Sequence, residues 1–185
     1  MTERSLARMV RRAREGDARA FGRLYDEYAD RVYAFVRSRT ESPQDAEDVT
    51  SVVFMKAWEA LGGYDDRGLP FTAWLFRIAR NAVVDEYRRG ARRPIPVEDL
   101  YVTEPAVGGP EEAVVAAADA RRLRAAVRGL TDDQAAVVAL RFWWNLSINE
   151  TAEALGKNDN AVKALQHRAI GSLARILRKE GSDEA

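Results

Sequence analysis

The arginine-rich segment 71–93 carries side-chain types that bind nucleic acid. Guanidinium groups pair with phosphates, an asparagine side chain can bond a base edge, and aromatic rings stack on bases. The segment supplies aromatic rings together with the polar residues Arg77, Arg80, Asn81, Arg88 and Arg89. Two interpretations are open at this point: a strand-binding surface, or an amphipathic core helix with a solvated basic face.

The spacing of apolar residues predicts that this segment is a helix. They recur at i, i+3, i+4 and i+7 from Phe71 to Tyr87, which places them on one face and most of the polar residues on another. Pro70 suits the first turn, Gly90 suits the end, and the arginines that follow suit the negative end of the helix dipole.

A second candidate for DNA recognition lies near the C-terminus. The capping box from Ser147 to Glu150 predicts a short helix that ends at Gly156, and a longer helix follows to about Lys179. This order is typical of a helix-turn-helix, whose second helix contacts bases through its N-terminal residues. The outward residues of that helix are suited to such contacts: Asn160, Lys163, Gln166 and His167.

The remaining elements are also predicted to be helical. Residues 3–15 and a long segment capped by Asp17 come first, then a helix capped by Ser42 that runs to about Leu61, and later a helix over 132–142. Three acids lie near the start of the Ser42 helix: Asp45, Glu47 and Asp48. They compensate the helix dipole or form an acidic docking face, and the residues alone favour the first interpretation.

The composition excludes several classes of site. The chain has no cysteine and one histidine, so the sequence predicts no disulfide, no metal site and no cofactor. No nucleophile–base pairing or glycine-rich phosphate loop indicates an enzyme. No apolar run approaches the roughly 20 residues of a membrane helix, and no secretory signal is visible, so a cytoplasmic location is expected.

The net charge of zero conceals a segregation of charge along the chain. Residues 96–120 hold six acids and no basic residue, a net charge of −6 between two mildly basic blocks. Residues 94–110 also hold four prolines, which predicts an extended linker. The expected fold is therefore all-α, with two small helical domains joined by an acidic linker: residues 1–93, 94–118 and 119–180.

Taken together, these blocks resemble the extracytoplasmic-function (ECF) sigma factors of bacterial RNA polymerase, over nearly the whole chain. The resemblance rests on DAEDVTSVVFMKAW (45–58), FTAWLFRIARNAVVDEYRR (71–89), GLTDDQAAVVALRF (129–142) and LSINETAEALGKNDNAVKALQHRA (146–169). Each motif is moderately specific, and their order and spacing are highly specific. Two residue positions depart from the family pattern, Ser51-Val52 and Ala164-Leu165-Gln166, and the pair Trp143-Trp144 is unusual.

The resemblance implies a role for each block. The first domain would dock on the β′ clamp of core polymerase through Asp45, Glu47, Asp48, Ser51 and Met55. It would also capture and open the −10 promoter element with the loop 63–70 and with Trp74, Arg77, Arg80, Asn81, Arg88 and Arg89. The second would meet the β flap and read the −35 element with Asn160, Lys163, Gln166, His167 and Arg168.

The resemblance also implies that the linker threads into the RNA channel and that an anti-sigma protein covers both DNA-binding domains. The rival interpretation is a stand-alone helix-turn-helix regulator, which usually binds paired half-sites as a dimer. A sigma-type adaptor with weak DNA binding is a third interpretation. For Trp143-Trp144, local packing is expected, whereas exposure would indicate a protein partner.

Overall fold

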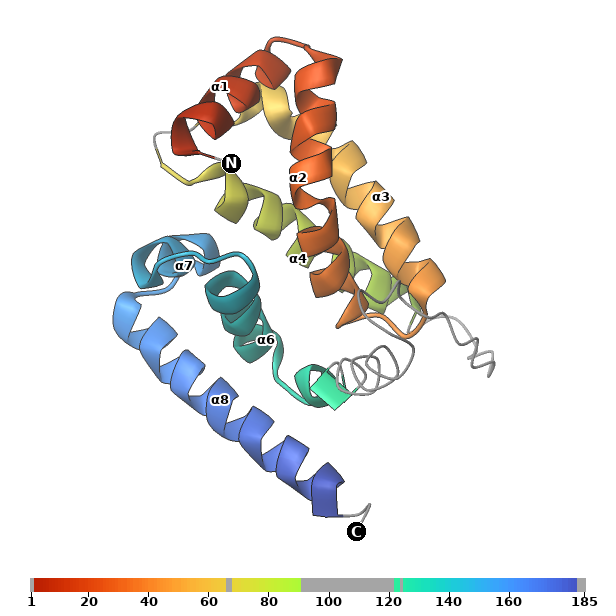
Figure 1. Cartoon of the computed structure of the whole chain (residues 1–185), viewed down its shortest axis with the longest axis vertical. Coiled ribbons are helices and arrows are strands. Elements are labelled where there is room, and N and C mark those ends of the chain that lie inside the picture. The colour runs from red at the N-terminus through yellow and green to blue at the C-terminus, as the bar shows by residue number, and fades with distance from the viewer. Residues whose placement is uncertain (1, 66–67, 91–121, 124, 183–185) are drawn as a thin grey trace, which may run out of the picture.

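The computed structural model describes residues 2–65, 68–90, 122–123 and 125–182. All of its regular elements over these residues are helical, in two groups that pack against each other (Figure 1). The predicted all-α class is confirmed. The predicted linker 94–110 and most of the helix expected before residue 128 lie outside the described residues.

The N-terminal group contains four helices and one 3₁₀ turn. They are α1 (Glu3–Arg14), α2 (Ala18–Arg37), α3 (Pro43–Ala60), the turn η1 (Leu61–Gly63) and α4 (Phe71–Gly90). Helices α2, α3 and α4 pack on one another, and α1 lies against α2 and η1. The buried residues of α4 include Phe71, Leu75, Phe76 and Ala79, the face that the apolar spacing predicts.

The helix starts are fixed by the side chains that the sequence indicated. The carboxylate of Asp17 accepts hydrogen bonds from the backbone N–H groups of Arg19 and Ala20, both at 3.0 Å. The bond from Ala20 and the nearby Arg12 guanidinium lower the pKa of Asp17 below its ordinary value. Ser42 Oγ accepts from the N–H of Asp45 at 3.0 Å, with Pro43 in the first turn of α3.

The C-terminal group begins with helical residues at 122–123 and 125–128. It continues with α6 (Asp132–Val138), a π-helical turn (Ala139–Trp143), α7 (Ile148–Leu155) and α8 (Asp159–Ser182). Capping boxes open α6 at Thr131 and α7 at Ser147, as predicted. The single helix expected over 132–142 is wrong in one respect, because the helix widens into the π-helical turn after Val138.

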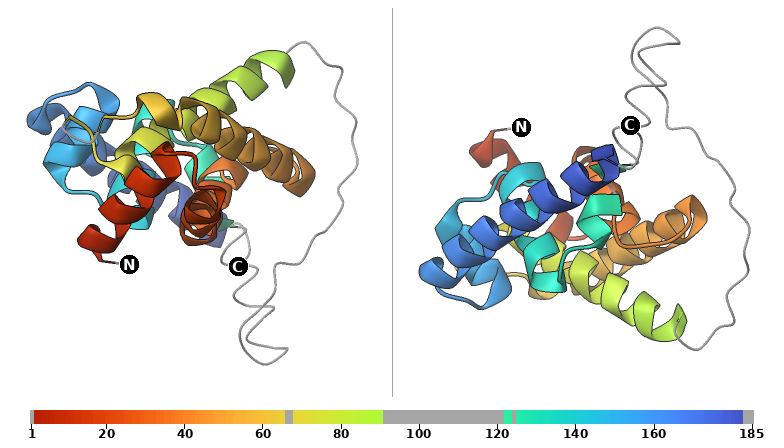
Figure 2. Two further views of the ribbon diagram at one scale, coloured as in Figure 1. Left: turned by 90° about the horizontal axis from the view of Figure 1, so that it is seen from above. Right: turned by 90° about the horizontal axis from the view of Figure 1, so that it is seen from below.

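Helix α4 lies at the boundary between the two groups, in contact with α2 and α3 on one side and with α7 on the other (Figures 1 and 2). One apolar cluster includes Leu24, Tyr28, Phe35 and Phe76 of the N-terminal group. The same cluster contains residues of the C-terminal group: Ala136, Ala139, Leu140, Trp144, Leu146 and Ala154. Burial in this core raises the pKa of Tyr28 to about 12, so its ring is neutral at physiological pH.

Candidate nucleic-acid interface

The polar face of α4 holds three of the predicted strand contacts, and two of them already have partners in the C-terminal group. Arg77 Nε donates to the backbone oxygen of Ala154 at 2.8 Å, and its Nη2 donates to that of Glu153. Arg80 Nη2 pairs with Asp133 Oδ1 at 3.0 Å. Asn81 is exposed beside them. The face has the expected side chains, and its guanidinium groups are engaged within the chain.

The other predicted strand contacts lie at the two ends of α4. Arg88 and Arg89 are exposed in its last turn, where Arg89 pairs with Glu86 at 3.3 Å. Trp74 is half-buried at the other end, with its ring centroid 5.1 Å from that of Tyr64. Tyr64 in turn donates its hydroxyl to the Leu69 carbonyl oxygen at 2.7 Å, which ties the loop before α4 to itself.

Helix α8 presents a polar face outward from its first turns. Asn160, Lys163, His167 and Arg168 are exposed. Gln166 is half-buried, and its Oε1 accepts from Arg141 Nε at 3.1 Å, so it is the one predicted base contact that is held within the chain.

The turn between α7 and α8 fixes that face. Gly156 has a φ of 63°, the left-handed conformation that ends α7. The Asn158 side chain accepts from the N–H of Ala161 at 2.8 Å at the start of α8. Val162 and Leu165 are buried against Ala152 of α7 and Val137 of α6, which leaves the polar side of α8 exposed. The predicted helix-turn-helix packing is therefore present.

The predicted docking surface on α3 is exposed along one side. Glu47, Asp48 and Ser51 are exposed, and Met55 exposes 55% of its surface. Asp45 differs from them, because it is half-buried and its carboxylate accepts from Ser42 Oγ at 2.7 Å. Asp45 thus has a capping role in the fold, whereas the other four side chains are free to meet a partner.

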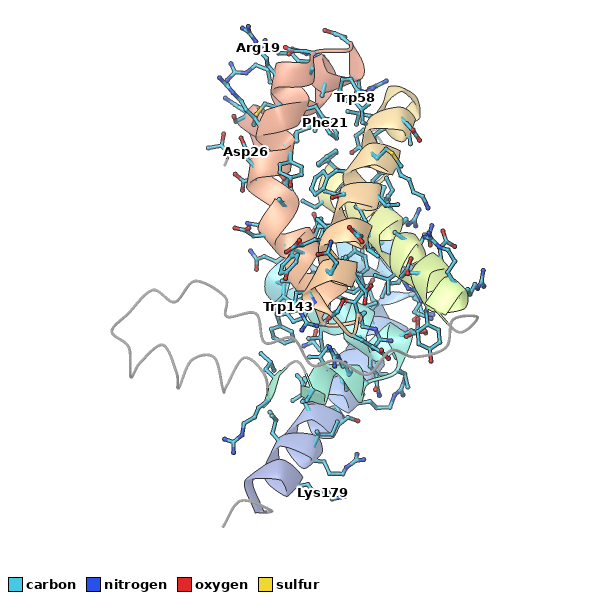
Figure 3. All side chains as sticks on the ribbon, turned by 90° about the vertical axis from the view of Figure 1, so that its right-hand side faces the viewer. Arg19, Phe21, Asp26, Trp58, Trp143 and Lys179 are labelled. Carbon is cyan, nitrogen blue, oxygen red and sulfur yellow. The ribbon has the colours of Figure 1, made fainter. Side chains whose placement is uncertain are left out.

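Two exposed aromatic residues near this surface were not predicted as site residues. Trp58 is 39% exposed on α3, and Tyr25 is 44% exposed on α2. Their rings continue an aromatic cluster, with Phe21 and Trp58 centroids 4.9 Å apart and Tyr25 and Phe54 centroids 4.6 Å apart (Figure 3). Their helical spacing indicated core positions, and no local signal in the sequence separates a core aromatic from a half-exposed one.

The unusual tryptophan pair has a structural role. Trp144 is 2% exposed and packs between the helix groups, with its ring centroid 5.5 Å from Phe76 and 6.2 Å from Tyr28. Trp143 is half-buried at the same boundary (Figure 3). The expected packing role is thus present, although it is long-range and not local. Phe142 is the exposed aromatic of this turn, at 58%.

Two further searches bear on the kind of site present. Within the described residues, no cluster of three or more His, Asp or Glu side chains could hold a metal ion. None of the described helices combines the length and the apolar character needed to cross a membrane.

An all-α protein with an exposed arginine helix and a helix-turn-helix is a DNA-recognition protein in its architecture. Two family descriptions match this chain, "Sigma-70 region 2" over residues 24–93 and "Sigma-70, region 4" over residues 120–173. The chain belongs to the ECF sigma factors of RNA polymerase, as the resemblance in its motifs predicted.

Individual relatives agree with this assignment. The ECF RNA polymerase sigma factor BldN of Streptomyces coelicolor is 40% identical over 170 residues, covering 91% of this chain and 64% of BldN. The ECF RNA polymerase sigma factor SigD of Mycobacterium tuberculosis is 34% identical, covering 89% of this chain and 80% of SigD. CnrH, solved in complex with the cytosolic domain of CnrY, is 28% identical with a TM-score of 0.71, covering 95% of this chain and 98% of CnrH.

Proposed function

We propose that this chain binds core RNA polymerase and directs transcription to specific promoters, reading the −35 element with α8 and opening the −10 element with α4. The observation that carries the proposal is the exposed face of α8, where Asn160, Lys163 and His167 point away from the packed side of the helix-turn-helix. Amide and cationic side chains at the start of such a helix suit base edges and phosphates.

The division of the chain follows the proposed roles. Residues 1–93 form the docking and −10 domain, 94–118 the acidic linker and 119–180 the −35 domain. Glu47, Asp48, Ser51 and Met55 offer an acidic surface with an apolar end, which suits a basic partner such as the β′ clamp. Asp45 belongs to the same segment and supports it through the Ser42 cap.

On α4, Arg77, Arg80, Arg88 and Arg89 are proposed to hold the phosphates of the displaced strand. Asn81 is placed to bond a base, and Trp74 with the preceding loop is placed to stack on one. On α8, Arg168 is proposed as a phosphate contact next to the base-reading residues, and Gln166 joins them if its bond to Arg141 opens.

An anti-sigma protein is a further proposed partner. The proposal is supported by CnrH, whose solved structure is a complex with the cytosolic domain of CnrY. We also propose that the chain acts in the cytoplasm, where it meets polymerase and DNA, and that it works by recognition and not by catalysis. A stand-alone regulator is the weaker alternative, because the family to which the chain belongs acts through RNA polymerase.

The test is to compare the protein alone with the protein bound to core polymerase on the same DNA. We expect weak binding to duplex DNA alone, co-elution with core polymerase on gel filtration, and promoter-specific run-off transcripts from the complex. Tight dimeric binding to duplex DNA without polymerase, and no transcript with it, would refute the proposal in favour of the regulator.

A further inference from the structure

Four polar contacts join the two helix groups at one surface, here called the closed interface. Arg77 reaches the last carbonyl groups of α7, and Arg80 reaches Asp133 at the start of α6. Arg39 at the end of α2 pairs with Asp132. Arg128 Nη2 donates to the Thr40 carbonyl oxygen at 2.6 Å. Each contact bridges residues more than 50 positions apart in the chain, so none follows from local structure.

An apolar anchor lies beneath these contacts. Trp144 inserts between Tyr28 of α2 and Phe76 of α4, and Leu140 and Leu146 are buried on either side of it. Burial of a tryptophan side chain contributes more contact area than any other residue type could at one position. The closed interface is therefore a packed surface as well as a set of ion pairs.

The backbone around Trp144 is irregular in a way that aims it at the N-terminal group. The π-helical turn Ala139–Trp143 precedes it, and the N–H of Trp144 bonds the Ala139 carbonyl at 3.0 Å. Asn145 follows with a φ of 53°, the left-handed region that asparagine tolerates better than most residues. The N–H of Leu146 then bonds the Leu140 carbonyl at 2.9 Å, which closes the turn.

The groups that hold the α4 arginines resemble the charge of a DNA strand. Arg80 is paired with a carboxylate, and Arg77 with the C-terminal carbonyl groups of a helix, where the helix dipole is negative. Phosphates would bind the same guanidinium groups through the same donor atoms. A promoter strand and the C-terminal helices therefore compete for one face of α4.

We infer that the closed interface masks the strand-binding face of α4 in the free protein, and that the two helix groups separate before a promoter strand is captured. This inference rests on the proposed function for the role of α4. It adds that the inhibitor of that face is the chain's own C-terminal domain, through Asp133, the end of α7 and Trp144.

The interface carries features that keep it reversible. Trp144 Nε1 is buried without a hydrogen-bond acceptor among the described residues, and an unpaired buried N–H disfavours the closed form. The Arg80–Asp133 pair is about one-third exposed on each side, so salt weakens it.

The masking is also selective. Glu47, Asp48, Ser51 and Met55 of α3 remain exposed in the closed form, as do Asn160, Lys163 and His167 of α8. Docking on the polymerase can thus precede opening, and binding at two separated positions on the polymerase would favour the open form.

The test uses the absence of cysteine in the sequence, which allows thiols to be placed without background. Arg39→Cys with Asp132→Cys puts two thiols across the closed interface, at a pair that contacts neither Arg77 nor Arg80. A bis-maleimide with an internal disulfide locks this pair, and a reductant releases it. Lys56→Cys with Asp85→Cys is the matched control, because that ion pair at 3.1 Å joins α3 to α4 within one group.

Transcription is measured with core polymerase on a promoter selected from a random pool with the unmodified protein. We expect the locked Arg39/Asp132 variant to lose transcript by about tenfold or more, the scale of 1.4 kcal/mol of blocked binding, and to recover on reduction. The locked Lys56/Asp85 control should transcribe as it does unlocked. Equal transcription by the locked and released Arg39/Asp132 variant overturns the inference.

A second measurement judges the closed form without relying on transcription. Spin labels at the same two cysteines report the distance between the groups in the free protein. One short distance, which lengthens when core polymerase is added or when Trp144→Ala is introduced, supports the inference, and a long or broad distribution in the free protein overturns it. A released variant and unmodified protein that both bind core polymerase but give no transcript count against the proposed function instead.

Discussion

Arg80 and Asn81 are neighbours on α4 with different surroundings. Arg80 is half-buried and paired with Asp133, whereas Asn81 is exposed beside it. Because a guanidinium suits phosphate and an amide suits a base edge, we assign strand affinity to Arg80 and base preference to Asn81. The spacing of apolar residues predicted the face on which both lie, but the Arg80–Asp133 pair joins positions far apart and has no signature in the sequence.

The double variant Arg80→Ala with Asn81→Ala tests this assignment. We expect promoter opening by the polymerase complex to fall by about tenfold to a hundredfold, because hydrogen bonds to charged groups contribute roughly 1.5–3 kcal/mol. Permanganate reactivity of unpaired thymines measures the opening, and gel filtration with core polymerase should be unchanged. Arg31→Ala, another exposed-side arginine paired within its own helix to Glu27, is the control. Loss of core binding in the double variant would contradict the assigned face.

Asp17 provides a test by pH at the start of α2. Its folded-state pKa is lowered by the N–H of Ala20 and by Arg12, so its contribution to stability is present above the unfolded value of 3.8 and is lost as pH falls through the folded value. The melting temperatures of the natural protein and Asp17→Asn should therefore differ most near neutral pH and converge below the folded pKa. A difference independent of pH would show that the charge of the cap is not involved.

At the scale of elements, helix starts were the most predictable part of the structure. Thr131 and Ser147 each open a helix with a capping box, and Asp17 and Ser42 cap theirs, because these signals lie within four residues of one another. The π-helical turn after Val138 was not predictable, because it depends on packing Trp144 against helices that are distant in the chain. The site residues on α8 were placed outward by periodicity alone.

Gly156 tests the geometry of the helix-turn-helix. Its φ of 63° is unfavourable for a residue with a side chain, so Gly156→Ala should lower the free energy of unfolding by about 1–2 kcal/mol. Urea denaturation followed by circular dichroism measures this change.

Gly171→Ala is the matched control for that substitution. Gly171 lies within α8 with no atom within 4 Å of an added Cβ, so alanine there should stabilise the protein by about 0.5–1 kcal/mol. Equal effects at both glycines would argue against a conformational requirement at Gly156.

At the scale of the whole molecule, one chain holds a docking surface on α3 and two DNA-binding faces on α4 and α8. The docking surface and the α8 face point outward, whereas the α4 face lies at the closed interface. The sequence predicted all three faces, because each has its own pattern of charge and spacing. It did not predict that two of them differ in accessibility, since that depends on how the groups pack.

Charge reversal on α3 tests the docking surface. Glu47→Lys with Asp48→Lys should slow association with core polymerase and remove much of its salt dependence, because exposed charges act mainly on the association rate. Glu59→Lys changes one exposed acid near the end of the same helix and serves as the control. Stopped-flow association with fluorescently labelled core polymerase measures both. Unchanged association of the double variant would place the docking surface elsewhere.

The most direct test of the central claim is to map transcript 5′ ends produced by core polymerase, with and without this protein, on a library of random promoter sequences. We predict start sites that appear only with the protein and that share two sequence elements upstream, one of which changes when Lys163 or His167 is substituted. Identical start sites with and without the protein would contradict its role as a promoter-specificity factor.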